Sequence, residues 1–68
     1  MEKRELDAVN IGEKIQAYRQ QKGLNIKELS RLVGISPSML SQMERNLANP
    51  SINTLKALSA ALETPLYY

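Results

Sequence analysis

The chain of 68 residues contains no cysteine, no histidine, no tryptophan and no phenylalanine. Without cysteine it can form no disulfide framework, no cysteine-ligated zinc site and no thiol nucleophile. Without histidine it lacks the imidazole on which His-ligated metal sites, Ser-His triads and most general bases depend. We therefore predict that the chain is not an enzyme and that it uses neither a metal nor a cofactor.

Its hydrophobic residues, 43% of the total, are almost all aliphatic, and its only aromatic residues are three tyrosines. Sheets favour aromatic and β-branched residues, so this composition favours a small helical bundle. The length allows one domain with a thin core. Apolar runs are too short to span a membrane, and the charged start lacks the apolar core of a secretion signal. The sequence predicts a cytoplasmic chain without a membrane segment.

Charge is distributed unevenly along the chain. Nine Lys and Arg against seven Asp and Glu give a net charge of +2. Residues 1–13 hold two basic and four acidic side chains, whereas residues 14–68 hold seven basic and three acidic ones, a net +4. A mildly basic body permits nucleic-acid binding without requiring it. We expect residues 1–9 to form an acidic, flexible leader and residues 10–68 to form the folded domain.

Helix start and stop signals recur at short intervals. The predicted N-caps are Asn10, Asn25, Ser36 and Ser51, and the predicted stops are Gly23, Gly34 and Asn46. Thr64-Pro65 would begin a fifth helix that the end of the chain cuts short. Apolar residues at helical spacing predict the buried faces; they are Ile11, Ile15, Tyr18, Leu29, Leu32, Val33, Leu40, Met43, Ile52, Leu55, Leu58, Ala61 and Leu62. The sequence predicts an all-α fold, a compact bundle of about five short helices.

The two middle helices match the generic helix-turn-helix pattern, in which a short turn containing glycine joins two short helices. All seven of its restricted positions fit, and they hold Leu29, Ser30, Val33, Gly34, Ile35, Leu40 and Met43. The small side chain of Ser30 lets the two helices cross closely, and Gly34 permits a tight turn. Seven fits, with caps at both helix starts, make this a specific signal.

From residue 10 to its end, the sequence resembles the phage-repressor-like helix-turn-helix domains, the Cro/repressor or xenobiotic-response-element type. The resemblance lies in Ile11, Ile15, Tyr18, Arg19, Lys22 to Leu24, Glu28 to Ser30, Val33 to Ser36, Ser38, Leu40 to Arg45, Asn49 to Ser51, Thr54, Leu55, Leu58, Ala61 and Leu62. It implies a lambda-repressor-like fold of five helices. In such domains the third helix enters the major groove and the second crosses the DNA backbone.

The helix expected between Ser36 and Asn46 presents an outward face without carboxylates. Ser38, Ser41, Gln42 and Arg45 share this face at helical spacing, where glutamine can pair with adenine and serine can reach a base or a phosphate. By family position, Pro37, Ser38 and Gln42 match places that touch base edges, although Pro37 can only pack on a thymine methyl. The predicted base-contacting residues are Pro37, Ser38, Ser41 and Gln42, with Gln42 the main direct reader.

Phosphate contacts are implied at two helix N-termini, where free N–H groups and the helix dipole favour an anion. The predicted phosphate-contacting residues are Asn25, Lys27, Arg31, Arg45, Asn49, Asn53 and Thr54. For Arg31 ordinary surface is an equal alternative. Met39 either covers the edge of the core, the favoured interpretation, or meets a thymine methyl. Because the loop at residues 47–49 lacks a Lys/Arg cluster, we expect a modest dependence of binding on salt.

The resemblance gives Arg19 and Glu44 a structural role, as a largely buried ion pair that ties the third helix to the first. It also implies a sequence-specific, double-stranded-DNA-binding domain of a prokaryotic transcription regulator associated with the nucleoid. Such domains bind as homodimers on dyad-symmetric operators, and many carry a C-terminal domain that pairs the subunits or binds an effector. The alternative is a protein-interaction module or an antitoxin with the same fold.

Overall fold

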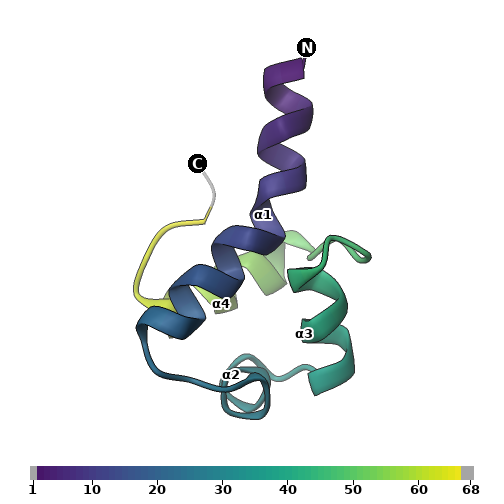
Figure 1. The fold of residues 1–68 in the computed structure, drawn as a ribbon. Coiled ribbons are helices and arrows are strands. Elements are labelled where there is room, and N and C mark those ends of the chain that lie inside the picture. Colours follow the sequence, from purple (N-terminus) through teal and green to yellow (C-terminus); the bar gives the residue numbers. More distant parts are fainter. Residues whose placement is uncertain (1, 67–68) are drawn as a thin grey trace.

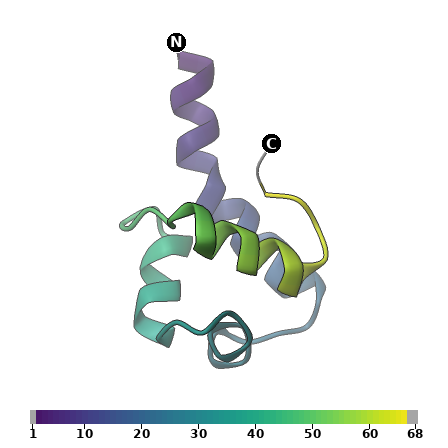
Figure 2. The same cartoon turned by 180° about the vertical axis from the view of Figure 1, so that it is seen from behind.

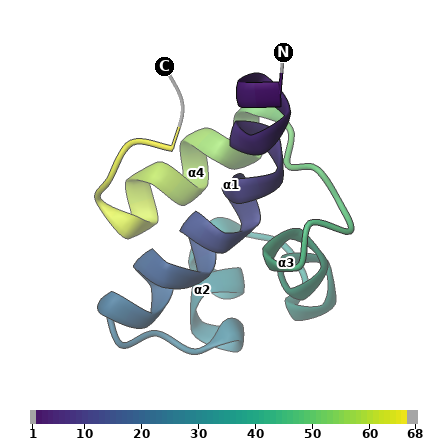
Figure 3. The same cartoon turned by 45° about the horizontal axis from the view of Figure 1, so that its top comes forward.

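The computed structural model of the chain describes residues 2–66, and the side chains of residues 11–66. These residues form four helices, α1 (Glu2–Gln21), α2 (Ile26–Val33), α3 (Pro37–Glu44) and α4 (Ile52–Leu62) (Figure 1). α1 packs against both α3 and α4, and α2 packs against the same two helices. With the top of the molecule tilted forward, α1 runs between α4 and α3 (Figure 3). The predicted all-α fold is confirmed.

Local capping explains where α2, α3 and α4 begin. The side chain of Asn25 accepts a hydrogen bond from the backbone N–H of Glu28 at 2.7 Å, and the Glu28 carboxylate accepts one from the N–H of Asn25 at 2.8 Å. Ser36 and Ser51 cap α3 and α4 by accepting from Met39 N and Thr54 N. Three of the four predicted caps are therefore confirmed, and each satisfies an N–H that the helix itself leaves free.

The first helix begins earlier than predicted. α1 begins at Glu2 rather than after Asn10, because residues 2–9 are mostly good helix formers and an asparagine inside a helix costs only about 0.7 kcal/mol. The N-terminal part of α1 projects away from the other three helices (Figures 1 and 2). That residues 1–9 form a flexible leader remains a prediction.

The expected fifth helix is missing from the residues that the structure describes. Residues 64–66 follow the end of α4 without helical structure, and the remaining predicted residues, 67–68, lie outside the described range. The N–H of Leu66 donates to the side-chain oxygen of Ser59 at 3.1 Å, a bond to a side chain and not to a helical carbonyl. Leu66 itself is buried, so this segment turns back onto the core.

The core is small and aliphatic. Its buried cluster consists of Ile15, Leu29, Leu40, Leu58, Leu62 and Leu66, with Tyr18 among the half-buried residues packed against it. Two predictions of burial were wrong, since Leu32 is 62% and Ile52 63% exposed. At about 100° per residue, Leu32 lies roughly 110° around α2 from the midpoint of the buried Leu29 and Ser30, which puts it at the rim of the apolar stripe. In the described part of the chain, no helix is both long and apolar enough to cross a bilayer.

Candidate nucleic-acid interface

The turn between α2 and α3 fixes how these two helices meet. Gly34 ends α2 with a φ of 88°, in the left-handed region that glycine adopts without strain. Its N–H and that of Ile35 both donate to the carbonyl of Ser30, at 2.8 and 3.0 Å. Ser30 is 2% exposed, and its hydroxyl donates to the carbonyl of Lys27 at 2.9 Å. Ser30 is thus a small, buried and internally satisfied residue near the end of α2, a helix that packs on α3.

We call one surface the outer face of α3; it consists of Pro37, Ser38, Ser41, Gln42 and Arg45. Pro37, Ser38 and Arg45 are exposed, whereas Ser41 and Gln42 are half-buried. The first turn of α3 contains no acidic residue, and the only carboxylate on the helix belongs to Glu44, which is buried. Met39 is 41% exposed, so its side chain is partly open to solvent. The outer face therefore presents hydroxyls, an amide and a guanidinium, with no exposed carboxylate on α3.

The inner side of α3 carries an ion pair to α1. Arg19 Nε donates to Glu44 Oε2 at 2.7 Å, and Arg19 Nη2 donates to Glu44 Oε1 at 3.1 Å. Arg19 Nη1 also donates to the carbonyl of Leu24 at 2.9 Å. The side chains are only 12% and 5% exposed. This two-pronged geometry is the one that makes Arg–carboxylate pairs strong and directional. It joins α1, the turn before α2, and the end of α3.

The N-terminus of α2 combines attractive and repulsive features for a phosphate. Lys27 and Arg31 are exposed and lie four residues apart, on one side of α2. Asn25 is exposed as well, but its side-chain oxygen and its N–H are both used in the capping box with Glu28. The Glu28 carboxylate therefore stands in the first turn, where it competes with any anion for the helix dipole.

The N-terminus of α4 lacks such a carboxylate. Its first turn contains no acidic residue, and Ser51 accepts from Thr54 N at 3.1 Å while donating to Thr54 Oγ1 at 3.0 Å. Asn49 and Asn53 are exposed, and Thr54 is half-buried. The positive end of the α4 dipole is thus less compensated than that of α2.

The predicted residues fall into two groups. One group lies on α2 and α3, two helices that pack directly on each other, and in this group three exposed cations (Lys27, Arg31 and Arg45) outnumber the one exposed carboxylate, Glu28. Asn49, Asn53 and Thr54 follow α3, on a loop that leaves its C-terminal end and on α4, which packs against α1 and α2 (Figure 1).

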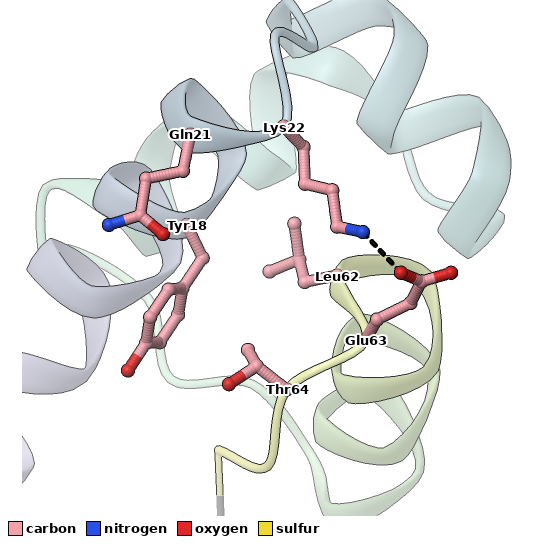
Figure 4. Close-up of a pocket in the computed structure, with 6 residues that line it drawn as sticks. All are labelled: Tyr18, Gln21, Lys22, Leu62, Glu63 and Thr64. Carbon is pink, nitrogen blue, oxygen red and sulfur yellow. Dashed lines mark hydrogen bonds and ion pairs between the residues drawn. The ribbon is translucent and has the colours of Figure 1, made fainter.

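A surface pocket lies apart from these residues, at the C-terminal ends of α1 and α4 (Figure 4). It is lined by Tyr18, Gln21, Lys22, Leu62, Glu63 and Thr64. Lys22 Nζ donates to the exposed Glu63 carboxylate. This hydrogen bond, together with the attraction of the lysine charge, holds the pKa of Glu63 below its usual value. None of the predicted site residues lines the pocket, so it is a separate surface feature.

Sequence reasoning missed one contact at the end of α3. The sequence predicts a helix stop at Asn46 and gives no sign of a contact with Gly12. In the structure the side-chain oxygen of Asn46 accepts a hydrogen bond from the N–H of Gly12 at 3.1 Å. The two residues are 34 positions apart, and neither carries a signal that links it to the other.

Comparison with known proteins gives consistent matches. The sequence model of the family described as Helix-turn-helix (HTH_3) matches residues 15–68. The chain is similar to the HTH-type transcriptional regulator SinR of Bacillus subtilis, with 43% identity over 58 residues, which cover 84% of this chain and 52% of SinR. It is also similar to the immunity repressor protein of Bacillus phage phi105, with 35% identity over 54 residues, 79% of this chain and 38% of that protein.

A solved structure that matches is the crystal structure of SinR, described as the master regulator for biofilm formation, in complex with DNA. Its TM-score is 0.77 at 44% identity, and the match covers 82% of this chain and 90% of that one. The chain spans about half the length of the curated SinR that it matches. The resemblance to Cro/repressor-type domains is confirmed.

Proposed function

This chain belongs to the helix-turn-helix family, and from that premise we propose that it is the DNA-binding domain of a prokaryotic transcription regulator. It reads double-stranded DNA by placing the outer face of α3 in the major groove. The regulator acts in the cytoplasm, where its operator DNA lies. The observation that carries the proposal is the outer face itself, which offers polar groups and a cation with no carboxylate among them. A relative with 44% identity was crystallised with DNA, which supports the same mode of action here.

In this proposal the residues that contact the bases are Pro37, Ser38, Ser41 and Gln42. The amide of Gln42 has the donor and acceptor needed to pair with adenine N7 and N6. The two serine hydroxyls can reach a base edge or a neighbouring phosphate, and Pro37 can pack on a thymine methyl. Because Gln42 is half-buried, its side chain keeps less rotational freedom than a free surface residue. That restraint lowers the entropy lost when it pairs with a base.

The residues proposed to contact phosphates lie on α2 and its cap, at the end of α3 and around the start of α4. They are Asn25, Lys27, Arg31, Arg45, Asn49, Asn53 and Thr54. The N-terminus of α4 is the better seat for a phosphate, since its first turn lacks the carboxylate that Glu28 places at α2. Three exposed cations would release about three counterions per domain, giving a salt slope of about −3. Affinity of one domain is therefore modest.

Pairing of two domains supplies the remaining affinity. A homodimer would match a dyad-symmetric operator whose half-sites lie about one helical turn, roughly 34 Å, apart. In this proposal the two domains pair on the DNA or through a C-terminal domain, which would also hold any effector site.

Fluorescence anisotropy against two duplexes tests the proposal. One duplex is selected from a randomised library on the wild-type protein, and the other has random sequence and the same length. We expect salt-sensitive binding to both and tighter binding to the selected duplex. Gln42→Ala should weaken binding to the selected duplex only, whereas the matched control Gln21→Ala, on the exposed end of α1, should change neither. No binding to either duplex at low salt would reject DNA binding and favour a protein-interaction module.

A further inference from the structure

The end of α3 is fixed by a residue in an unusual backbone conformation. Asn46 has a φ of 63°, and apart from Glu63 it is the only non-glycine residue with a positive φ in the part of the chain that the structure describes. Its side chain turns towards α1, where Oδ1 accepts from Gly12 N at 3.1 Å. The left-handed conformation that stops α3 therefore also delivers an acceptor to the first helix.

Gly12 receives this contact because it has no side chain. A Cβ built there would lie 2.3 Å from the carbonyl oxygen of Met43 and 2.7 Å from that of Glu44. Both atoms belong to the backbone of α3 and cannot move aside as a flexible side chain would. The absence of a Cβ thus lets the backbone of α1 come against the last carbonyls of α3, close enough for Asn46 to reach the Gly12 amide.

Together with the ion pair, this contact holds α3 to α1 at two points. Arg19 binds Glu44 and Gly12 binds Asn46, and Gly12 and Arg19 lie seven residues apart on α1, about 10 Å along its axis. Both contacts meet the C-terminal end of α3, at residues 44 and 46, and together they restrict how this end lies against α1. α1 also bends where its projecting part meets the bundle (Figures 1 and 2). A side-chain acceptor that engages a helical N–H is a known cause of such bends.

We infer that Asn46 is a positioning residue, which sets the orientation of α3 relative to α1 and thereby the sequence discrimination of the outer face. The inference rests on the proposed function, because orientation matters only if the outer face reads a ligand. Recognition groups must stay within about 0.5 Å and 10–20° of their productive geometry. Phosphate contacts tolerate more movement than paired base edges, so discrimination should suffer before general affinity does.

Three variants of the 68-residue chain test this inference. Asn46→Gly removes the acceptor while suiting the positive φ, and Asn46→Asp keeps an acceptor at the same place. Glu63→Gly is the matched control, because it puts glycine at the other left-handed position, 57° in φ, at the end of α4 and away from α3. For each variant, residual dipolar couplings report the orientation of α3 relative to α1 in the free protein. Anisotropy then gives the ratio of affinities for the selected and the random duplex.

We expect Asn46→Gly to change the couplings of α3 relative to those of α1 and to lower the affinity ratio about tenfold, with random-duplex binding within twofold of wild type. Asn46→Asp and Glu63→Gly should keep the wild-type couplings and a ratio within threefold. Unchanged couplings in Asn46→Gly, or changed couplings with an unchanged ratio, would overturn the inference. So would an equal loss of ratio in Asn46→Gly and Asn46→Asp, which would indicate direct contact with DNA. Failure of the wild type to bind either duplex would reject the proposed function, while the couplings would still test the two-point attachment.

Discussion

The inner and outer sides of α3 both carry polar side chains, but their surroundings differ. On the inner side the Glu44 carboxylate is 5% exposed and takes two hydrogen bonds from Arg19. On the outer side Ser38 and Arg45 are exposed to solvent. A buried charge is tolerated only with a partner, whereas an exposed hydroxyl or guanidinium can exchange water for a ligand. Burial thus separates the polar residues of α3 that fix the fold from those available for recognition.

The strongest test of the inner side is Glu44→Ala. It leaves the Arg19 guanidinium largely buried without its carboxylate, so the free energy of unfolding should fall by about 3–5 kcal/mol. Urea denaturation followed by circular dichroism measures it. Glu13→Ala, on the exposed side of α1, is the control and should cost less than about 0.5 kcal/mol. Replacing both partners by Met and Leu should cost less than Glu44→Ala alone, and an equal or greater loss would contradict this account.

Gly12→Ala tests the backbone contact on the same side. In most helices this change stabilises, by about 1 kcal/mol. Here the new Cβ would overlap the carbonyl of Met43, so strain of about 1–3 kcal/mol should outweigh that gain. Thermal or urea unfolding should show lower stability for Gly12→Ala, whereas Gln16→Ala at an exposed position of α1 should be nearly neutral. A stabilised Gly12→Ala protein would show that α1 and α3 are not in close contact.

On the outer side Gln42→Ala should separate binding from stability. Its free energy of unfolding should change by less than about 0.5 kcal/mol, as for other substitutions outside the core. Binding to the selected duplex should weaken by about 1–3 kcal/mol, the usual value of one good base pairing. Anisotropy and urea denaturation on the same preparation measure both. A large loss of stability with unchanged discrimination between the two duplexes would show that Gln42 supports the fold and does not read bases.

The capped starts of α2, α3 and α4 could be predicted because the information is local. Asn25, Ser36 and Ser51 each act on a residue three positions away. The residues of the outer face could also be predicted, because helical spacing decides which side chains share one side of α3. Leu32 could not be placed correctly, because its exposure depends on which part of α2 meets its neighbours. The Gly12–Asn46 contact spans 34 positions and exists only after α1 and α3 have packed.

The smallest expected effect concerns Lys22 and Glu63, an exposed pair outside the comparison of the two sides. Lys22 lowers the pKa of Glu63 in the folded chain. A carboxyl whose pKa is lowered by folding adds stability above its unfolded pKa and loses it as pH falls through the folded value. Lys22→Ala should therefore raise the pKa of Glu63 towards its ordinary value in a carbon-13 NMR titration. Identical titration curves would show that the pair does not form in solution.

The proposed mode of DNA binding depends on where DNA touches the domain. Titrating the nitrogen-15-labelled chain with the selected duplex and following backbone amide shifts measures this directly. We predict the largest shifts at Ser38 and Gln42 on the outer face of α3, smaller ones at the start of α4, and none at Lys22 and Glu63. Shifts concentrated around the pocket at the ends of α1 and α4, or no shifts at low salt, would contradict the account.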